Sequence, residues 1–114
     1  ILLAIMWVTA AFGEELFYRG YLMNRLAKYF GNKNESWFLA AAISAAYFGL
    51  AHLYQGWSGV ITTGIGGFVL GLLFMKKRSL WLPILVHGTY DMIGITFIYL
   101  GKESWVADLF HINF

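Results

Sequence analysis

Charged side chains interrupt a strongly apolar stretch near the start of the chain. Residues 1–12, which are mostly aliphatic, aromatic or methionine, lead into Gly13-Glu14-Glu15-Leu16-Phe17-Tyr18-Arg19-Gly20. A charged side chain at bilayer depth costs about 2.5–3.5 kcal/mol on insertion scales, so ionisable residues in apolar segments usually carry a function. A structural polar knot that holds helices together is the alternative, and this stretch alone does not decide between the two.

Spacing gives the two neighbouring acids different partners. Glu15 and Arg19 are four residues apart, with the acid first, which is the favourable order for an ion pair on a helix. Glu14 is rotated by about 100° from Glu15 around the helix axis and faces another neighbour. The pattern therefore predicts that Glu15 is held in a structural ion pair while Glu14 stays available.

Two histidines and a third acid lie in later apolar segments. His52 follows Phe48 by four residues, and Asp91 follows His87 by four residues. One histidine on an apolar face is more often a satisfied core residue, but two histidines and two spare acids would satisfy one another if they clustered. Such a cluster could hydrolyse a bond, because a glutamate near a histidine can hold and deprotonate a water molecule. A second histidine with its acid could donate a hydrogen bond to the developing oxyanion.

A zinc site is the weaker alternative. His52, His87 and a carboxylate such as Glu14 could form a His2Glu site. The chain has no HExxH motif, however, because Leu53-Tyr54-Gln55 follows His52. It also has no cysteine, which excludes a thiol nucleophile, a disulfide and a thiolate metal site. We therefore expect no metal and no other cofactor.

The composition is that of an integral membrane protein. The 114 residues are 60% hydrophobic and 12% charged, whereas a soluble domain carries about 25% charged residues. The net charge of +2 comes from short basic clusters between apolar runs, a topology signal that does not indicate nucleic-acid binding. The opening apolar run lacks the basic start of a signal peptide. Because the chain begins without Met and already in helical character, we expect residues 1–114 to be a single core cut from a longer membrane protein with further transmembrane helices.

The apolar segments predict an all-α membrane bundle of about four transmembrane helices. They cover residues 2–30, 37–54, 57–75 and 80–100, each near the roughly 20 residues that cross a bilayer. Gly20 can bend the first segment, in which case the amphipathic part after it would lie along the membrane interface. Asn34 or Ser36 is expected to cap the second helix, and Pro83 fits the first turn of the fourth. Small residues in the second segment, and Gly67 and Gly71 in the third, predict close helix packing.

The basic residues predict the orientation. If every segment crosses the bilayer, the two basic loops share one side, and the opposite loop, residues 54–59, carries no charge. Positive loops mark the cytoplasmic side. A rise of 1.5 Å per residue places Glu14 and His52 roughly 22–24 Å from this side, but His87 and Asp91 only at roughly 11 and 17 Å. The second pair therefore needs a tilted helix or a loop that dips into the membrane. The basic residues concerned are Arg25, Lys28, Lys33, Lys76, Lys77 and Arg78.

Three motifs in order resemble those of a known family. Glu14-Glu15-xxx-Arg19, Phe48-xxx-His52 and His87-xxx-Asp91 are similar to the motifs of the CPBP (Abi) family. This family comprises type II CAAX prenyl endopeptidases and proteins of bacteriocin processing or self-immunity. Each motif alone is common, but three in this order on successive membrane segments are specific, and the resemblance covers nearly the whole chain.

The resemblance implies a glutamate-dependent, metal-independent endopeptidase embedded in a membrane. Glu14 would match the residue that activates water together with His52, and His87 and Asp91 the pair that stabilises the oxyanion. The expected substrate is a peptide or lipidated protein, and the expected location is the bacterial plasma membrane with its basic loops in the cytoplasm. Structural roles would fall to Glu15, Arg19 and Phe48.

Asp91 departs from the eukaryotic CAAX enzymes, which have Asn at this position. Two roles stay open for it: a protonated acid that donates directly to the oxyanion, or an ionised acid that orients His87. The rival to the enzyme is a non-catalytic immunity or scaffold protein that keeps the polar cluster for stability. A transporter fragment is a weaker third alternative. The joint presence of Glu14, His52 and His87 favours the enzyme, because a scaffold needs only the Glu15–Arg19 pair.

Overall fold

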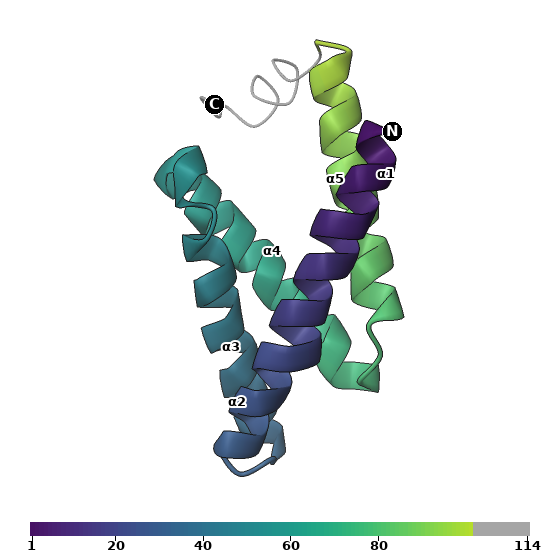
Figure 1. The fold of residues 1–114 in the computed structure, drawn as a ribbon. Helices are drawn as coiled ribbons and strands as arrows, with labels where there is room; N and C mark the ends of the chain where they lie inside the picture. The colour runs from purple at the N-terminus through teal and green to yellow at the C-terminus, as the bar shows by residue number, and fades with distance from the viewer. Residues whose placement is uncertain (102–114) are drawn as a thin grey trace.

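A computed structural model describes residues 1–101, and every regular element within them is a helix. Figure 1 shows two long arms that meet in the lower half of the molecule. One arm holds the N-terminal helix and α5 (Trp81–Tyr99), and the other holds α3 (Asn34–Leu50) and the start of α4 (Gly56–Lys77). The predicted all-α fold is confirmed.

The N-terminal segment is one continuous helical rod. It consists of α1 (Leu2–Met6), the π-helical turns η1 (Trp7–Glu14) and η2 (Leu16–Met23), and α2 (Asn24–Tyr29). The chain stays helical through Gly20, and an interfacial position of the part after this residue stays a prediction. The amide of Asn24 donates to the carbonyl oxygens of Arg19 at 3.2 Å and Gly20 at 2.9 Å, at the position of the predicted bend.

A tight turn joins α2 to α3. Gly31, with φ of 108°, and Asn32, with φ of 59°, leave the helix in left-handed conformations. The Asn32 N–H donates to the Ala27 carbonyl at 2.8 Å and the Gly31 N–H to the Lys28 carbonyl at 3.2 Å, which is a Schellman motif.

The capping residue of α3 differs in part from the prediction. Lys33, and not Asn34, precedes the helix as its N-cap. The Ser36 hydroxyl accepts a hydrogen bond from the Lys33 N–H at 3.2 Å and donates to the Phe30 carbonyl at 2.8 Å. Ser36, the other predicted capping residue, therefore ties the start of α3 to the turn.

Small residues let α3 and α4 pack closely, as predicted. The two helices are joined by a turn that contains the short helix η3 (Leu53–Gln55). A Cβ on Gly49 would lie 2.7 Å from the Val60 carbonyl oxygen, and one on Gly71 would lie 3.1 Å from the Ala41 Cβ. A side chain on Gly49 would force the helices apart, and one on Gly71 would require Ala41 to shift.

The last helix is placed by a sharp turn and by a glycine. Arg78 ends α4 in a left-handed conformation with φ of 53°. Pro83 lies in the first turn of α5, where a missing backbone N–H leaves no hydrogen bond unmade. Further along, α5 packs on η1, and the Trp7 indole occupies the space that a Cβ on Gly88 would need. This close contact brings the neighbouring His87 to the N-terminal rod.

The described chain buries an ion pair and exposes many large apolar side chains. Glu15 and Arg19 are fully buried, whereas large apolar side chains such as Leu16, Phe17 and Ile65 are about half exposed or more, at 48%, 52% and 63%. A soluble protein buries such residues, while a membrane protein presents them to lipid. Two of the described helices, Leu53–Lys77 and Trp81–Tyr99, are long and apolar enough to cross a membrane. The predicted count of four crossings is not confirmed, since α3 has only 17 residues and the rod is assembled from shorter pieces.

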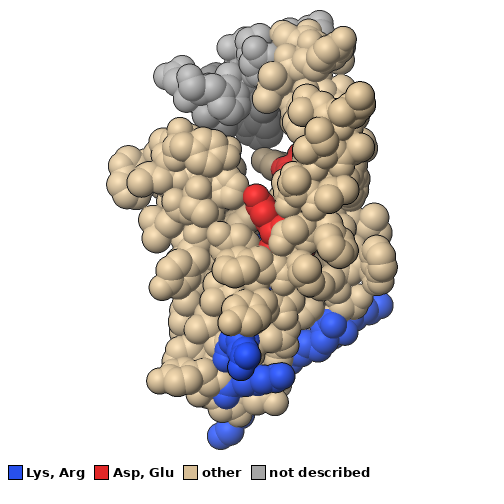
Figure 2. All heavy atoms as spheres, in the orientation of Figure 1, with Lys and Arg blue, Asp and Glu red and all other residues tan. Residues whose placement is uncertain are grey.

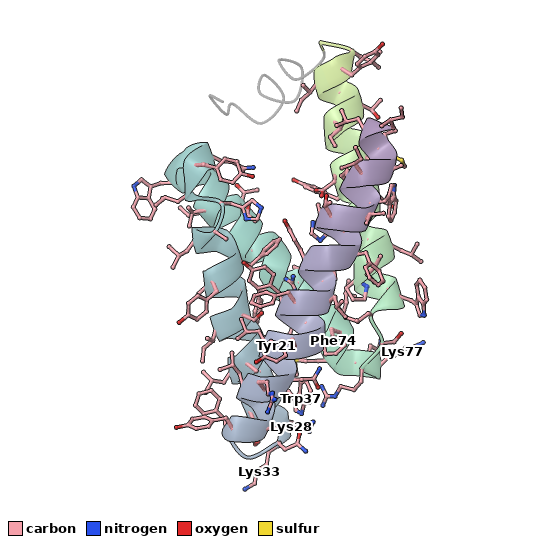
Figure 3. The ribbon with its side chains drawn as sticks, in the orientation of Figure 1. Tyr21, Lys28, Lys33, Trp37, Phe74 and Lys77 are labelled. Atoms are coloured by element: carbon pink, nitrogen blue, oxygen red, sulfur yellow. The ribbon has the colours of Figure 1, made fainter. Side chains whose placement is uncertain are left out.

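Apart from the buried Arg19, the basic residues that the structure describes gather at one end of the molecule. Figure 2 shows the Lys and Arg side chains of this face at its lower end, and Figure 3 places Lys28, Lys33 and Lys77 there. The two basic loops therefore share one end, as the alternation of helices predicted. An apolar core lies at the same end, where Trp37 packs against Phe74 with ring centroids 6.3 Å apart. The Arg78 guanidinium lies over the Trp37 ring, 3.3 Å from its centroid.

Candidate active site

A buried ion pair links the rod to the α3–α4 hairpin. The Arg19 Nη1 lies 3.1 Å from the Glu15 Oε1, and both side chains have no exposed surface. The Arg19 Nη2 donates to the Gly67 carbonyl oxygen of α4. The guanidinium also lies over the Phe48 ring of α3, 4.9 Å from its centroid. The ion pair predicted from spacing is therefore present, and it joins three helices.

His87 brings the acids of two distant segments together. Its Nδ1 lies 2.7 Å from the Glu15 Oε1, and its Nε2 lies 3.2 Å from the Asp91 Oδ2 and 3.8 Å from the Glu14 Oε2. We call Glu14, Glu15, Arg19, His87 and Asp91 the acid–histidine cluster. The imidazole is the centre of this cluster, with one acid on Nδ1 and two acids on Nε2.

The cluster is open on the Nε2 side. The side chain of His87 is only 8% exposed, whereas those of Glu14 and Asp91 are 32% and 28% exposed. In Figure 2 the acidic side chains visible on this face lie in a recess between the two arms of the molecule. The partly exposed acids could thus meet a molecule that enters from outside, while Glu15 and Arg19 could not.

The charges around His87 require a shared proton. Two carboxylate oxygens face Nε2, and a lone pair on that nitrogen would repel an ionised carboxylate. A proton must therefore lie on Nε2 or on one of the two acids. Even with His87 protonated, the three carboxylates exceed the two cations by one negative charge.

His52 lies apart from the cluster, on the far side of Phe48. The Phe48 ring contacts both imidazoles edge to face, with centroids 4.8 Å from His52 and 5.8 Å from His87. Within residues 1–101 no hydrogen bond joins His52 to Glu14 or His87, although His52 is near enough to Glu14 for their charges to interact. The expected convergence of Glu14, His52 and His87 is thus direct for Glu14 and His87 only.

The tautomer of a neutral His52 follows from its backbone contact. Its Nδ1 lies 2.7 Å from the Phe48 carbonyl oxygen, which can only accept a hydrogen bond. Nδ1 therefore donates, and in the neutral ring Nε2 carries the lone pair. That nitrogen is the one available as a base.

Some contacts of the site have no sequence signal and others have a weak one. Nothing in the spacing predicts that Glu15 also binds His87, since 72 positions separate them. The role of Gly67 as the acceptor for Arg19 has a weak signal in the Gly67/Gly71 spacing, which indicated close packing. A Cβ on Gly67 would lie 2.7 Å from the Phe48 Cδ1 and 3.0 Å from the Arg19 Nη2.

Within the described residues, neither a metal site nor a groove provides a second candidate active site. In the described part of the chain no three His, Asp or Glu side chains are arranged to hold a metal ion, and the need for a metal stays a matter of prediction. An apolar groove of about 430 Å³ lies between α3 and α4, lined by residues such as Ala42, Ile61 and Phe68, and includes no member of the cluster. The chemistry is therefore argued from the cluster.

Comparison with known proteins gives one match. The sequence profile of type II CAAX prenyl endopeptidase Rce1-like proteins matches residues 1–93, which include the whole acid–histidine cluster and His52. No curated protein and no solved structure matches the chain. The protein is an integral membrane protein, as this match, the apolar exterior and the two membrane-length helices together indicate. The chain belongs to the Rce1-like type II CAAX prenyl endopeptidase family.

Proposed function

We propose that the protein is an intramembrane endopeptidase that hydrolyses a peptide bond with a water molecule activated by Glu14. The observation that carries the proposal is the pair of partly exposed acids, Glu14 and Asp91, on the open side of the buried His87. Ionisable groups inside a membrane are costly. A purely structural ion pair between Glu15 and Arg19 would not need Glu14 and Asp91 beside it. The family supports a protease of the CAAX type.

Glu14 is the proposed general base. Its carboxylate would take a proton from the bound water, and the hydroxide formed would attack the carbonyl carbon of the substrate. The same carboxyl would then return the proton to the leaving nitrogen as the C–N bond breaks. His52 would assist from across Phe48 through its Nε2.

His87 and Asp91 are the proposed oxyanion stabilisers. A protonated Nε2 would donate a hydrogen bond to the carbonyl oxygen of the substrate as negative charge develops there. The distance of 3.2 Å from Nε2 to the Asp91 Oδ2 supports an orienting role for Asp91, which is the arrangement we propose. Direct donation by a protonated Asp91 is the alternative.

The proposed substrate is a peptide or protein with a prenylated CAAX end, and the proposed reaction uses no metal. Bacteriocin processing or self-immunity is the alternative within the same wider family. The proposed location is the bacterial plasma membrane, with the basic end of the bundle in the cytoplasm.

The test is cleavage of an internally quenched, prenylated CAAX peptide by the purified protein in lipid nanodiscs. Glu14→Gln should lower kcat by at least about 100-fold, the usual contribution of a general base. It should leave the thermal unfolding temperature unchanged, because the nearest ionic partner of Glu14 is 3.8 Å away. Glu35→Gln, at an exposed acid of the basic end, is the control and should cleave normally.

The same experiment addresses the non-catalytic rival. A scaffold or immunity protein would show no cleavage that depends on Glu14, and Glu14→Gln would then lower stability as much as Glu15→Gln does. Equal stability losses in these two variants, without a difference in cleavage, would support that rival.

A further inference from the structure

Two donors converge on a single oxygen of Glu15. The Oε1 lies 3.1 Å from the Arg19 Nη1 and 2.7 Å from the His87 Nδ1, and none of these side chains is more than 8% exposed. The other oxygen, Oε2, has no hydrogen-bond partner among the described residues. Oε1 is therefore the point at which the ion pair of the N-terminal rod meets the histidine of α5.

This contact decides which nitrogen of His87 carries a proton. Because Arg19 donates to Oε1, this oxygen acts as an acceptor, and an Nδ1 at 2.7 Å must donate to it. A lone pair on Nδ1 would face the carboxylate in a dry site, where like-charge repulsion is strong. With Nδ1 bound to Glu15, the ring presents Nε2 to Glu14 and Asp91. A second proton on Nε2, which the proposed oxyanion role needs, makes the ring a cation.

We propose that Glu15 is a positioning residue for His87. It holds the proton on Nδ1 and aims Nε2 at the open side of the cluster, while Arg19 keeps Oε1 in place. Removing such an outer partner of a working histidine typically lowers activity by about 10–100-fold. The catalytic meaning of this role rests on the proposed function, whereas the position of the proton does not.

His52 supplies an internal reference. Its Nδ1 also donates, but to the backbone carbonyl of Phe48, which no side-chain substitution at position 15 removes. Both histidines should therefore carry a proton on Nδ1, which His87 donates to Glu15 and His52 to the Phe48 carbonyl oxygen. Only the form of His87 should respond to Glu15.

The test is ¹⁵N NMR of the histidine rings in the full chain, labelled only at histidine and held in lipid nanodiscs. The chain has three histidines, so His52→Gln and His87→Gln assign the signals. In the unsubstituted protein the His87 Nδ1 should resonate as a proton-bearing nitrogen. A His87 Nδ1 with a lone pair in the unsubstituted protein would overturn the proposal.

Three variants separate positioning from ion pairing. Glu15→Gln keeps an oxygen acceptor and should keep the Nδ1 proton. Arg19→Met removes the ion pair but keeps Glu15, so the His87 Nδ1 should also keep its proton in this variant. The double variant Glu15→Leu/Arg19→Met removes the acceptor without stranding a buried charge, and its His87 Nδ1 proton should be lost or shared with Nε2. The His52 signal should stay the same in all three.

The activity of the same variants gives a second readout. The double variant should lose kcat by at least about 10-fold with little change in KM, because Glu15 does not touch the substrate. Persistence of the His87 Nδ1 proton in the double variant would overturn the positioning role. A proton that moves as expected, in a protein that never cleaves the peptide, would support the positioning role and reject the proposed protease function.

Discussion

At the scale of single residues, neighbouring acids of the same type receive different tasks. Glu15 is fully buried between Arg19 and His87, whereas Glu14, one position earlier, is 32% exposed beside Nε2. The rotation of successive side chains around a helix is enough to separate them. One acid can therefore hold the structure while its neighbour meets a substrate.

Asp91 provides a prediction at this scale. Its carboxylate lies 3.2 Å from the His87 Nε2. Asn can accept a hydrogen bond from a protonated Nε2 or donate one to a neutral Nε2, so Asp91→Asn should keep the ring oriented and retain part of the activity. Leu can do neither, and Asp91→Leu should lower kcat by about 10–100-fold, the loss typical of removing the partner that orients a working histidine.

The measurement is kcat on the prenylated CAAX peptide, with thermal unfolding as a check on folding. Asp91→Leu is the larger chemical change at a site that is only partly exposed, so its unfolding temperature should be compared with that of Asp91→Asn. If both variants cleaved the peptide as fast as the unsubstituted protein, Asp91 would have no part in the reaction.

Sequence spacing predicts contacts within one helix and fails for contacts between helices. The pairs Glu15–Arg19 and His87–Asp91 follow from the four-residue repeat, and both are found. The bond from Glu15 to His87 depends on how α5 packs on η1. No local pattern encodes that distance, so Glu15 was expected to serve Arg19 alone.

At the scale of helices, close approach at glycines positions the site. Gly88 lets α5 lie against Trp7, and Gly67 lets α4 reach Phe48 and Arg19. The helix bounds follow closely from apolar runs and turn residues, because these are local properties. The chain stays helical through Gly20, where a bend was predicted, and the Asn24 amide donates to the carbonyl oxygens of Arg19 and Gly20.

The arrangement of helices also resolves the difference in depth between the two halves of the site. A residue count from the basic loops placed His87 and Asp91 roughly 5–13 Å nearer to the basic end than Glu14 and His52. Figure 1 shows that α4 crosses the bundle obliquely and that the α4–α5 connection lies above the α2–α3 connection. The count assumed two loops at one level. Because α5 starts higher, His87 reaches Glu14 and Glu15.

Two adjacent glycines of α4 give a matched prediction at this scale. A Cβ on Gly67 would lie 2.7 Å from the Phe48 Cδ1, whereas one on Gly66 would meet no atom within 4 Å. Gly67→Ala should therefore destabilise the fold by about 1–3 kcal/mol through overpacking. Gly66→Ala should be neutral or stabilise by up to about 1 kcal/mol, because alanine is the better helix former.

Thermal unfolding of both variants in the same detergent measures this difference, and peptide cleavage reports on the site. Gly67→Ala should also lower activity, since its Cβ would displace Phe48 and Arg19 together. If both alanine variants shifted the unfolding temperature alike, the close contact at Gly67 would not determine the stability of the fold.

At the scale of the whole molecule, the distribution of polarity is the inverse of that in a soluble protein. Within residues 1–101, charged groups lie at the basic end or in the acid–histidine cluster, and large apolar side chains cover much of the remaining surface. Composition alone predicted this, because a chain with 12% charged residues and 60% hydrophobic residues cannot cover itself with polar groups. The number of crossings is harder to predict, since apolar length does not distinguish a spanning helix from a buried one.

The last prediction concerns this number and the orientation. If the rod, α3, α4 and α5 each cross the membrane, the α2–α3 and α4–α5 connections lie on one side and the α3–α4 turn on the other, as their places in Figure 1 suggest. The chain has no cysteine, so Lys33→Cys, Lys77→Cys and Ser58→Cys each introduce a single thiol at an exposed position. Because positive loops stay in the cytoplasm, an impermeant maleimide should label the first two only in inside-out vesicles and the third only in right-side-out vesicles. Labelling of all three from one side would reject the four crossings, and reversed labelling would keep the crossings and reject the orientation.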